Sequence, residues 1–162
     1  MTPAQLATLK ADILNDPAFA SKPMTSGAGL EIAAAYNLKA SPDFTVWRTN
    51  VSQDVIMQNG FDWVRVDNLS VGKARIWEWL FDNSSGAINP SKDNVRAGIA
   101  ECWKGTPADV AVRDAVLVHC KRFATRAEKL FATGTGSDAS PAVMGFEGIV
   151  TSDNVQEARE LP

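Results

Sequence analysis

The chain has 162 residues, of which 45% are hydrophobic and 22% are charged, and its formal net charge is −3. This length suits one domain with a substantial hydrophobic core, and the composition is that of an ordinary globular protein. A net negative charge argues against a dedicated nucleic-acid-binding protein, and two cysteines are too few for a disulfide scaffold or a zinc knuckle.

The first residues predict an amphipathic helix. Thr2-Pro3-Ala4-Gln5 has the form of a capping box, Leu6, Leu9 and Ile13 share one helical face, and Pro17 stops the helix. This pattern is not that of a signal peptide, and no run approaches the roughly 20 apolar residues that cross a bilayer. We therefore expect a protein that is made and matures in a reducing cytoplasm.

Short elements are predicted in the next part of the chain. A helix around residues 30–36 precedes Phe44–Trp47, which is β-prone and is either a brief strand or a buried extended segment. Another short helix begins at Ser52 and ends at Gly60. Residues 61–66 alternate between two faces, which predicts an extended linker.

A longer helix begins at Asn68 or Ser70 and is followed by a turn at 83–86. On this helix, Trp77 and Trp79 point in nearly opposite directions, so we expect one of the two tryptophans to be exposed. An exposed tryptophan favours a protein interface.

The longest predicted element is a helix from Thr106 to Phe131, around which the rest of the fold is expected to be organised. Thr106 is its N-cap, Pro107 occupies the first helical position, and Asp109 lies in the first turn. No proline or glycine interrupts the rest of the run, and apolar residues recur at three- and four-residue steps: Val112, Val116, Cys120, Phe123, Ala127, Leu130 and Phe131. The preceding helix, over 91–105, is expected to be its antiparallel neighbour.

The composition changes after this helix. Residues 133–141 are small, polar and glycine-rich, and 142–151 resemble a strand interrupted by two glycines, before a short terminal helix. We therefore predict a mainly α fold. Its body, 1–132, is a helical bundle around one long central helix, and 133–162 form a flexible Gly/Ser tether, a short extended or β C-terminal arm and a short terminal helix. The arm either folds back over its own core or adds a strand to another subunit. In the second case the partner-binding side chains are Met144, Phe146, Ile149 and Val150.

Charge is unevenly distributed along the chain. Residues 1–69, 70–131 and 132–162 carry net charges of −2, +3 and −4. A basic middle and an acidic tail favour head-to-tail contact between copies of the chain, and two solvated faces are the alternative interpretation.

Four cations are predicted on or near one side of the long helix: Lys121, Arg122, Arg126 and Lys129. Near the C-terminus of a helix, such residues interact favourably with the helix dipole. The alternative is that they face DNA phosphates or an acidic partner. Four such contacts give a weak, salt-sensitive and sequence-independent affinity, which suits the wall of a channel.

No residue pattern indicates an active site, so we expect no enzymatic activity, catalytic residue, cofactor or metal. His119 is the only histidine and is expected to be a partly buried structural residue, with a general base beside a cysteine as the alternative. Cys120 points about 100° away from it on a helix, and Cys102 lies on the preceding helix. Gly134-Thr135-Gly136 lacks the GK[ST] ending of a phosphate-binding loop, and no acidic pair lies near His119 at a familiar metal-ligand spacing.

Three stretches resemble a known group of proteins: Phe44–Trp47, the sequence DNLSVGKARIWEWL at 67–80, and Lys121–Gly136. They are similar to the small, helix-rich proteins encoded among the virion-assembly genes of tailed bacteriophages and prophages. The likeness covers Pro3 to Glu160. Within that group, the chain looks most like the head–tail connector, or adaptor, type.

The resemblance implies a structural virion protein at the neck of the particle, assembled in the cytoplasm of the bacterial host. Proteins of this type form a ring of about a dozen copies beneath the portal protein, lengthen the DNA channel and accept the tail. The implied partners are further copies of the chain, the portal protein, a tail or neck protein and, non-specifically, the packaged DNA, with no membrane. The alternatives are a tail-completion or capsid-decoration protein of the same virion, a small non-specific DNA-binding module, and an enzyme such as a Cys–His hydrolase.

Overall fold

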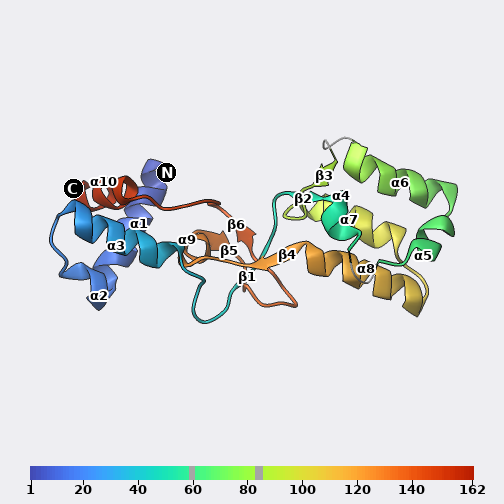
Figure 1. Cartoon of the computed structure of the whole chain (residues 1–162), viewed down its shortest axis with the longest axis horizontal. Helices are drawn as coiled ribbons and strands as arrows, with labels where there is room; N and C mark the ends of the chain where they lie inside the picture. Colours follow the sequence, from blue (N-terminus) through green and yellow to red (C-terminus); the bar gives the residue numbers. More distant parts are fainter. Residues whose placement is uncertain (59–60, 83–85) are drawn as a thin grey trace. The chain divides into compact units, whose positions relative to one another are not determined.

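A computed structural model describes residues 1–58, 61–82 and 86–162 (Figure 1). The fold is mainly helical, as predicted. The helices span Pro3–Asn15 (α1), Pro17–Ala20 (α2), Ser26–Asn37 (α3), Gln53–Ile56 (α4), Trp63–Asp67 (α5), Val71–Asp82 (α6), Asp93–Cys102 (α7), Pro107–His119 (α8), Arg126–Leu130 (α9) and Ser152–Glu160 (α10). The strands span Thr45–Trp47 (β1), Val51–Ser52 (β2), Ala87–Ile88 (β3), Lys121–Phe123 (β4), Ala132–Thr133 (β5) and Val143–Met144 (β6). Gly60, the predicted helix end, and most of the predicted turn at 83–86 lie outside the described residues.

The described chain forms two compact units. The first unit combines Met1–Thr45 with Phe123–Pro162, and the second unit is Val46–Arg122. The described strands pair as β1 with β4, β2 with β3, and β5 with β6. Composition predicted a division of the chain at residue 132. The structure divides it elsewhere, because the tail packs with the N-terminal helices in the first unit.

In the first unit, α10 packs against α1 and α3, and Figure 1 shows this red helix beside the two blue ones. The capping box predicted at Thr2 is present at the start of α1. The core draws on both ends of the chain: Leu6, Leu9, Ile13, Phe19, Ile32, Ala33, Tyr36, Ala127, Val150, Val155 and Ala158. A core of this kind can form only when the C-terminal segment returns to the N-terminal helices.

The second unit contains α4 to α8 and the antiparallel pair of β2 with β3, in which Val51 faces Ile88. Aromatic rings fill the centre of its core. The ring centroid of Trp77 lies 5.7 Å from that of Trp103 and 5.1 Å from that of Phe81. The remaining buried residues include Ile56, Ile99, Val112 and Val116.

The long helix predicted from Thr106 to Phe131 is not one helix. The predicted start is correct, with Thr106 as N-cap in a capping box with Asp109, but α8 ends at His119. Strand β4 and the short helix α9 follow it. Thr125 starts α9, because its hydroxyl accepts from the Glu128 N–H while the Glu128 side chain accepts from the Thr125 N–H. This second capping box satisfies donors that an uninterrupted helix would have bonded internally.

The extended linker predicted at 61–66 is also wrong, because Trp63–Asp67 form α5. The Asp62 carboxylate accepts hydrogen bonds from the backbone N–H groups of Val64 and Arg65, at 3.1 and 3.4 Å. Such a cap starts a helix where the apolar pattern is too short to predict one.

The glycine-rich segment after α9 is folded onto the first unit. The Thr45 N–H donates to the Gly136 carbonyl at 2.7 Å, and the Ala142 N–H donates to the Thr45 carbonyl at 2.9 Å. Within the segment, the Thr135 hydroxyl donates to the Ser140 carbonyl at 3.0 Å. Beyond it, β6 pairs with β5 of the same chain, so the short β element of the predicted arm finds its partner within its own unit.

Replacing Gly136 with alanine is expected to lower the free energy of unfolding by about 2 kcal/mol. Gly136 has a φ of +66°, and an added Cβ would lie 2.2 Å from the Phe44 ring. Gly27 on α3 is the matched control, because a Cβ there meets nothing within 4 Å, and Gly27→Ala is expected to be neutral or stabilising by up to about 1 kcal/mol. Denaturant unfolding measures both changes, and equal stability of the two variants would contradict the folded loop.

Candidate functional site

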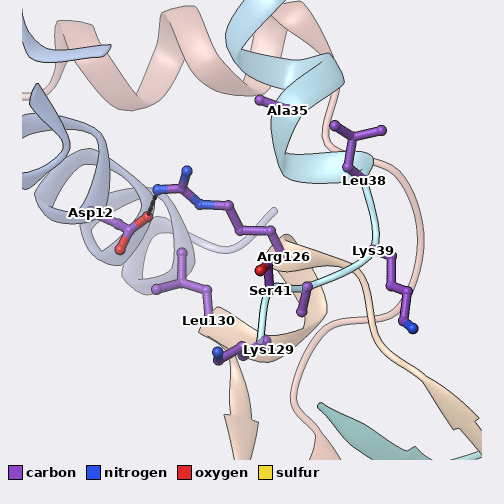
Figure 2. Close-up of a pocket in the computed structure, with 9 residues that line it drawn as sticks. Asp12, Ala35, Leu38, Lys39, Ser41, Arg126, Lys129 and Leu130 are labelled. Carbon is purple, nitrogen blue, oxygen red and sulfur yellow. Dashed lines mark hydrogen bonds and ion pairs between the residues drawn. The ribbon is translucent and has the colours of Figure 1, made fainter. Parts of the chain in front are cut away.

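The candidate site is a groove of about 650 Å³ in the first unit, below the end of α3 and beside α9 (Figure 2). Its wall combines apolar side chains with cations from α9 and from the segment after α3, and with a carboxylate from α1. The lining residues are Asp12, Ala35, Leu38, Lys39, Ala40, Ser41, Arg126, Lys129 and Leu130.

Arg126 forms the fixed part of the groove wall. Its guanidinium contacts the carboxylates of Asp12 and Asp16, each at 2.8 Å, and Figure 2 shows the side chain extending from α9 toward Asp12. It also lies over two aromatic rings, 4.5 Å from the centroid of Tyr36 and 5.0 Å from that of Phe19. Two ion pairs and two cation–π contacts hold Arg126 in one position.

The hydrogen bonds around Arg126 shift the pKa values of its neighbours. The Ala18 N–H and then Arg126 stabilise the charged Asp16 carboxylate, so its pKa lies below the ordinary value. Burial, together with a hydrogen bond that the Tyr36 hydroxyl donates to Asp12, raises the pKa of Tyr36. At neutral pH the cluster therefore combines a charged Asp16 carboxylate, a charged guanidinium and a neutral phenol.

Two lysines occupy the rest of the groove. Lys39 forms an ion pair with Asp43 at 2.7 Å and lies 3.7 Å from the centroid of the Phe123 ring. Lys129 lies 5.6 Å from the centroid of the Phe44 ring. The groove thus presents cations at an apolar surface, with much of their charge already balanced by carboxylates. This arrangement suits contact with another surface better than acid–base chemistry.

The four predicted cations do not share one helix face. Lys121 and Arg122 lie in β4, whereas Arg126 and Lys129 lie in α9 and line the groove together. Sequence reasoning missed Asp12 and Asp16, the partners of Arg126. Their i, i+4 spacing on the N-terminal helix was visible, but nothing local linked them to a residue more than 100 positions later.

The four predicted arm residues differ in exposure. Val150 is buried, and its backbone exchanges hydrogen bonds with the Asn37 side chain at 2.8 and 2.9 Å. Phe146 packs against Phe131 with 5.5 Å between ring centroids. Met144 lies in β6 and is partly buried, whereas Ile149 is 73% exposed. The segment is therefore anchored to its own unit, with Ile149 at the surface.

Both cysteines are buried, and the histidine lies at the end of a helix. Cys102 and Cys120 are both buried, and burial raises their pKa values to about 11 and about 12. Both thiols are therefore protonated at neutral pH, whereas a nucleophilic cysteine reacts as the thiolate. His119 is the last residue of α8 and is partly exposed. Within the described residues, no group of three His, Cys, Asp or Glu side chains is placed to hold a metal ion.

The second unit exposes large apolar side chains on α5 and α6. Trp79 is 66% exposed while Trp77 is buried, which confirms the expectation that one of the two faces solvent. The other large apolar side chains exposed on these two helices are Trp63, Val64 and Val71. In the described part of the chain, no helix has the length and apolar character needed to span a bilayer.

Comparisons with known proteins found no match to a family model, to a curated protein or to a solved structure.

Proposed function

We propose that this protein is a structural component of a tailed-phage virion, a ring-forming adaptor that connects the head to the tail and extends the DNA channel. The observation that carries the proposal is the exposure of large apolar side chains on α5 and α6, where Trp63, Val64, Val71 and Trp79 are each more than half exposed. Aromatic side chains, tryptophan above all, are enriched at protein interfaces. They suit a protein that acts by docking onto neighbouring subunits.

The resemblance of 44–47, 67–80 and 121–136 to virion-assembly proteins points to the same class, and the mainly helical fold agrees with it. The alternatives receive less support from the chemistry. Arg126 is already held by two carboxylates, which weakens the basic surface of a DNA-binding module. Protonated, buried thiols disfavour a Cys–His hydrolase.

The test is the copy number of the protein in purified particles, measured by quantitative mass spectrometry and combined with imaging that locates it. We expect about a dozen copies at the neck, and a mostly monomeric chain in isolation. Absence from the particle, or one or two copies, contradicts the proposal. Many copies on the capsid identify a decoration protein, and density at the tail end identifies a tail-completion protein.

A further inference from the structure

The outward face of α10 carries three carboxylates. Val155 and Ala158 are buried in the core of the first unit, so Asp153, Glu157 and Glu160, spaced i, i+4 and i+7, share the opposite face and are exposed. Among the described residues, none of the three forms an ion pair. The helix therefore presents a face of unpaired negative charge.

The position of these carboxylates is unfavourable in the single chain. Glu157 and Glu160 lie in the last turn of α10, where the negative end of the helix dipole disfavours negative charge. The only basic residue of that turn, Arg159, donates to the backbone carbonyls of Lys22 and Pro23. A cationic surface placed against this face would relieve the repulsion.

The second unit carries positive charge around Trp47. The Arg96 guanidinium lies 4.7 Å from the centroid of the Trp47 ring, and the Lys121 ammonium lies 5.8 Å from it. Arg48 follows Trp47 in sequence, and its buried Nε has no hydrogen-bond partner among the described atoms. Cations fixed against an aromatic ring are preorganised for contact with anions.

Lys92 lies four residues, about one helical turn, before Arg96 and adds a further positive charge on this side of the second unit. It is exposed and occupies the N-cap of α7 without a side-chain capping bond. Positive charge is disfavoured there by the positive end of the α7 dipole. We call Arg48, Lys92, Arg96 and Lys121 the Trp47 cluster. Asp93 pairs with Arg96 and balances part of the positive charge of this cluster.

The two units also differ in total charge. The first unit has six basic and ten acidic side chains, a net charge of −4, and the second has ten basic and nine acidic side chains, a net charge of +1. Glu157 and Glu160 in the C-terminal turn of α10, and Lys92 at the N-cap of α7, each carry the charge that the dipole of their own helix disfavours. The two surfaces are therefore complementary across two copies of the chain.

We propose that the exposed face of α10 on one copy docks onto the Trp47 cluster of the next copy. This inference rests on the proposed function, because such a head-to-tail contact repeats around a ring. Charge contacts of this kind supply orientation and fast association more than affinity, and salt weakens them. A weak contact keeps the chain monomeric in solution and becomes effective when a template concentrates the copies.

Carbodiimide cross-linking tests the contact, because this reagent joins a carboxylate directly to an amine without a spacer. Unlabelled and heavy-isotope-labelled full-length chains are mixed at high concentration and low salt, so that mass spectrometry identifies links between copies. We expect Lys92 of one copy to be linked to Glu157 or Glu160 of another. Raising the ionic strength from about 0.05 to about 0.3 M is expected to reduce the yield severalfold.

Variants that reverse the charge of the α10 carboxylates test whether these residues make the contact. Combining Glu157→Lys with Glu160→Lys is expected to raise the dissociation constant for self-association at least about tenfold, measured by sedimentation. Combining Asp54→Lys with Asp114→Lys makes the same charge change on exposed residues of α4 and α8 and is expected to leave it within about twofold. Mixing the α10 double variant with Lys92→Glu is expected to restore association. The cross-link then forms with amine and carboxylate exchanged.

Three results would overturn the contact: no link between copies, links from α10 to amines outside the Trp47 cluster, or no rescue in the mixture. DNA binding that Lys92→Glu abolishes, without any link between copies, would assign the cluster to nucleic acid and also overturn it. The particle copy number is an independent measurement. A ring in the virion without the α10 link refutes only the contact, whereas the link without a virion ring refutes only the adaptor role.

Discussion

Replacing Trp103 with alanine is expected to lower the free energy of unfolding by about 3–5 kcal/mol, the usual cost of removing a fully buried tryptophan. Trp103 has no exposed surface and packs edge-on against Trp77 and Phe61, with ring centroids 5.7 and 6.4 Å away. Its removal leaves a cavity at the centre of the aromatic cluster. Denaturant unfolding followed by circular dichroism measures the loss, and hydrogen exchange is expected to increase first within Val46–Arg122.

Trp103→Phe is the matched control for this prediction. The indole Nε1 of Trp103 is buried without a hydrogen-bond partner among the described atoms, so phenylalanine removes an unsatisfied donor along with part of the ring. An unsatisfied buried donor costs about 1–3 kcal/mol, which offsets much of the lost packing. We expect a net loss below about 1.5 kcal/mol. If phenylalanine is as damaging as alanine, the Nε1 group has a partner and the explanation is wrong.

Replacing Arg126 with alanine is expected to destabilise the first unit by about 3 kcal/mol. The change removes ion pairs to Asp12 and Asp16 and leaves two partly buried carboxylates close together. It also removes the cation over Tyr36 and Phe19. Arg113→Ala is the control, because Arg113 pairs with its exposed neighbour Asp114, and such pairs contribute about 0–1 kcal/mol.

The same variant is expected to change the response to acid. The pKa of Asp16 is lower in the folded chain than in the unfolded chain, because the Ala18 N–H and Arg126 stabilise its charged form. Asp16 therefore contributes stability above about pH 4, and this stability is lost as the pH falls through the lower folded pKa. Arg126→Ala removes part of the shift, so stability should fall less steeply below about pH 4. An unchanged slope would show that the Ala18 bond alone sets the pKa.

The predicted long helix shows where periodicity fails. Its apolar stripe continues past His119 at helical spacing, yet the backbone changes to a strand at Lys121–Phe123 and begins a new helix at Arg126. Spacing indicates which side chains can share a face of a helix, but it does not reveal a break between two successive helices. The local signal was the Thr125-x-x-Glu128 capping box, which has the same form as the correctly predicted cap at Thr2.

The candidate site was only partly predictable for a related reason. Arg126 and Lys129 were recognised as cations, but the residues that neutralise or contact them come from distant segments: Asp12, Asp16 and Phe44. No local pattern links positions more than 80 residues apart. The glycine-rich segment is similar, since its composition indicates flexibility while its bonds to Thr45 fold it in place.

Local chemistry in the sequence was enough to predict the helical class, the caps at Thr2 and Thr106, a strand or buried extended segment at Phe44–Trp47 and the exposure of one of two neighbouring tryptophans. Each of these depends on residues within a few positions of one another. The two-unit division, the return of the tail to the first core and the neutralised Arg126 depend on contacts between distant parts of the chain. Those contacts form only when burial of apolar surface brings the segments together, and so they were settled by the tertiary fold.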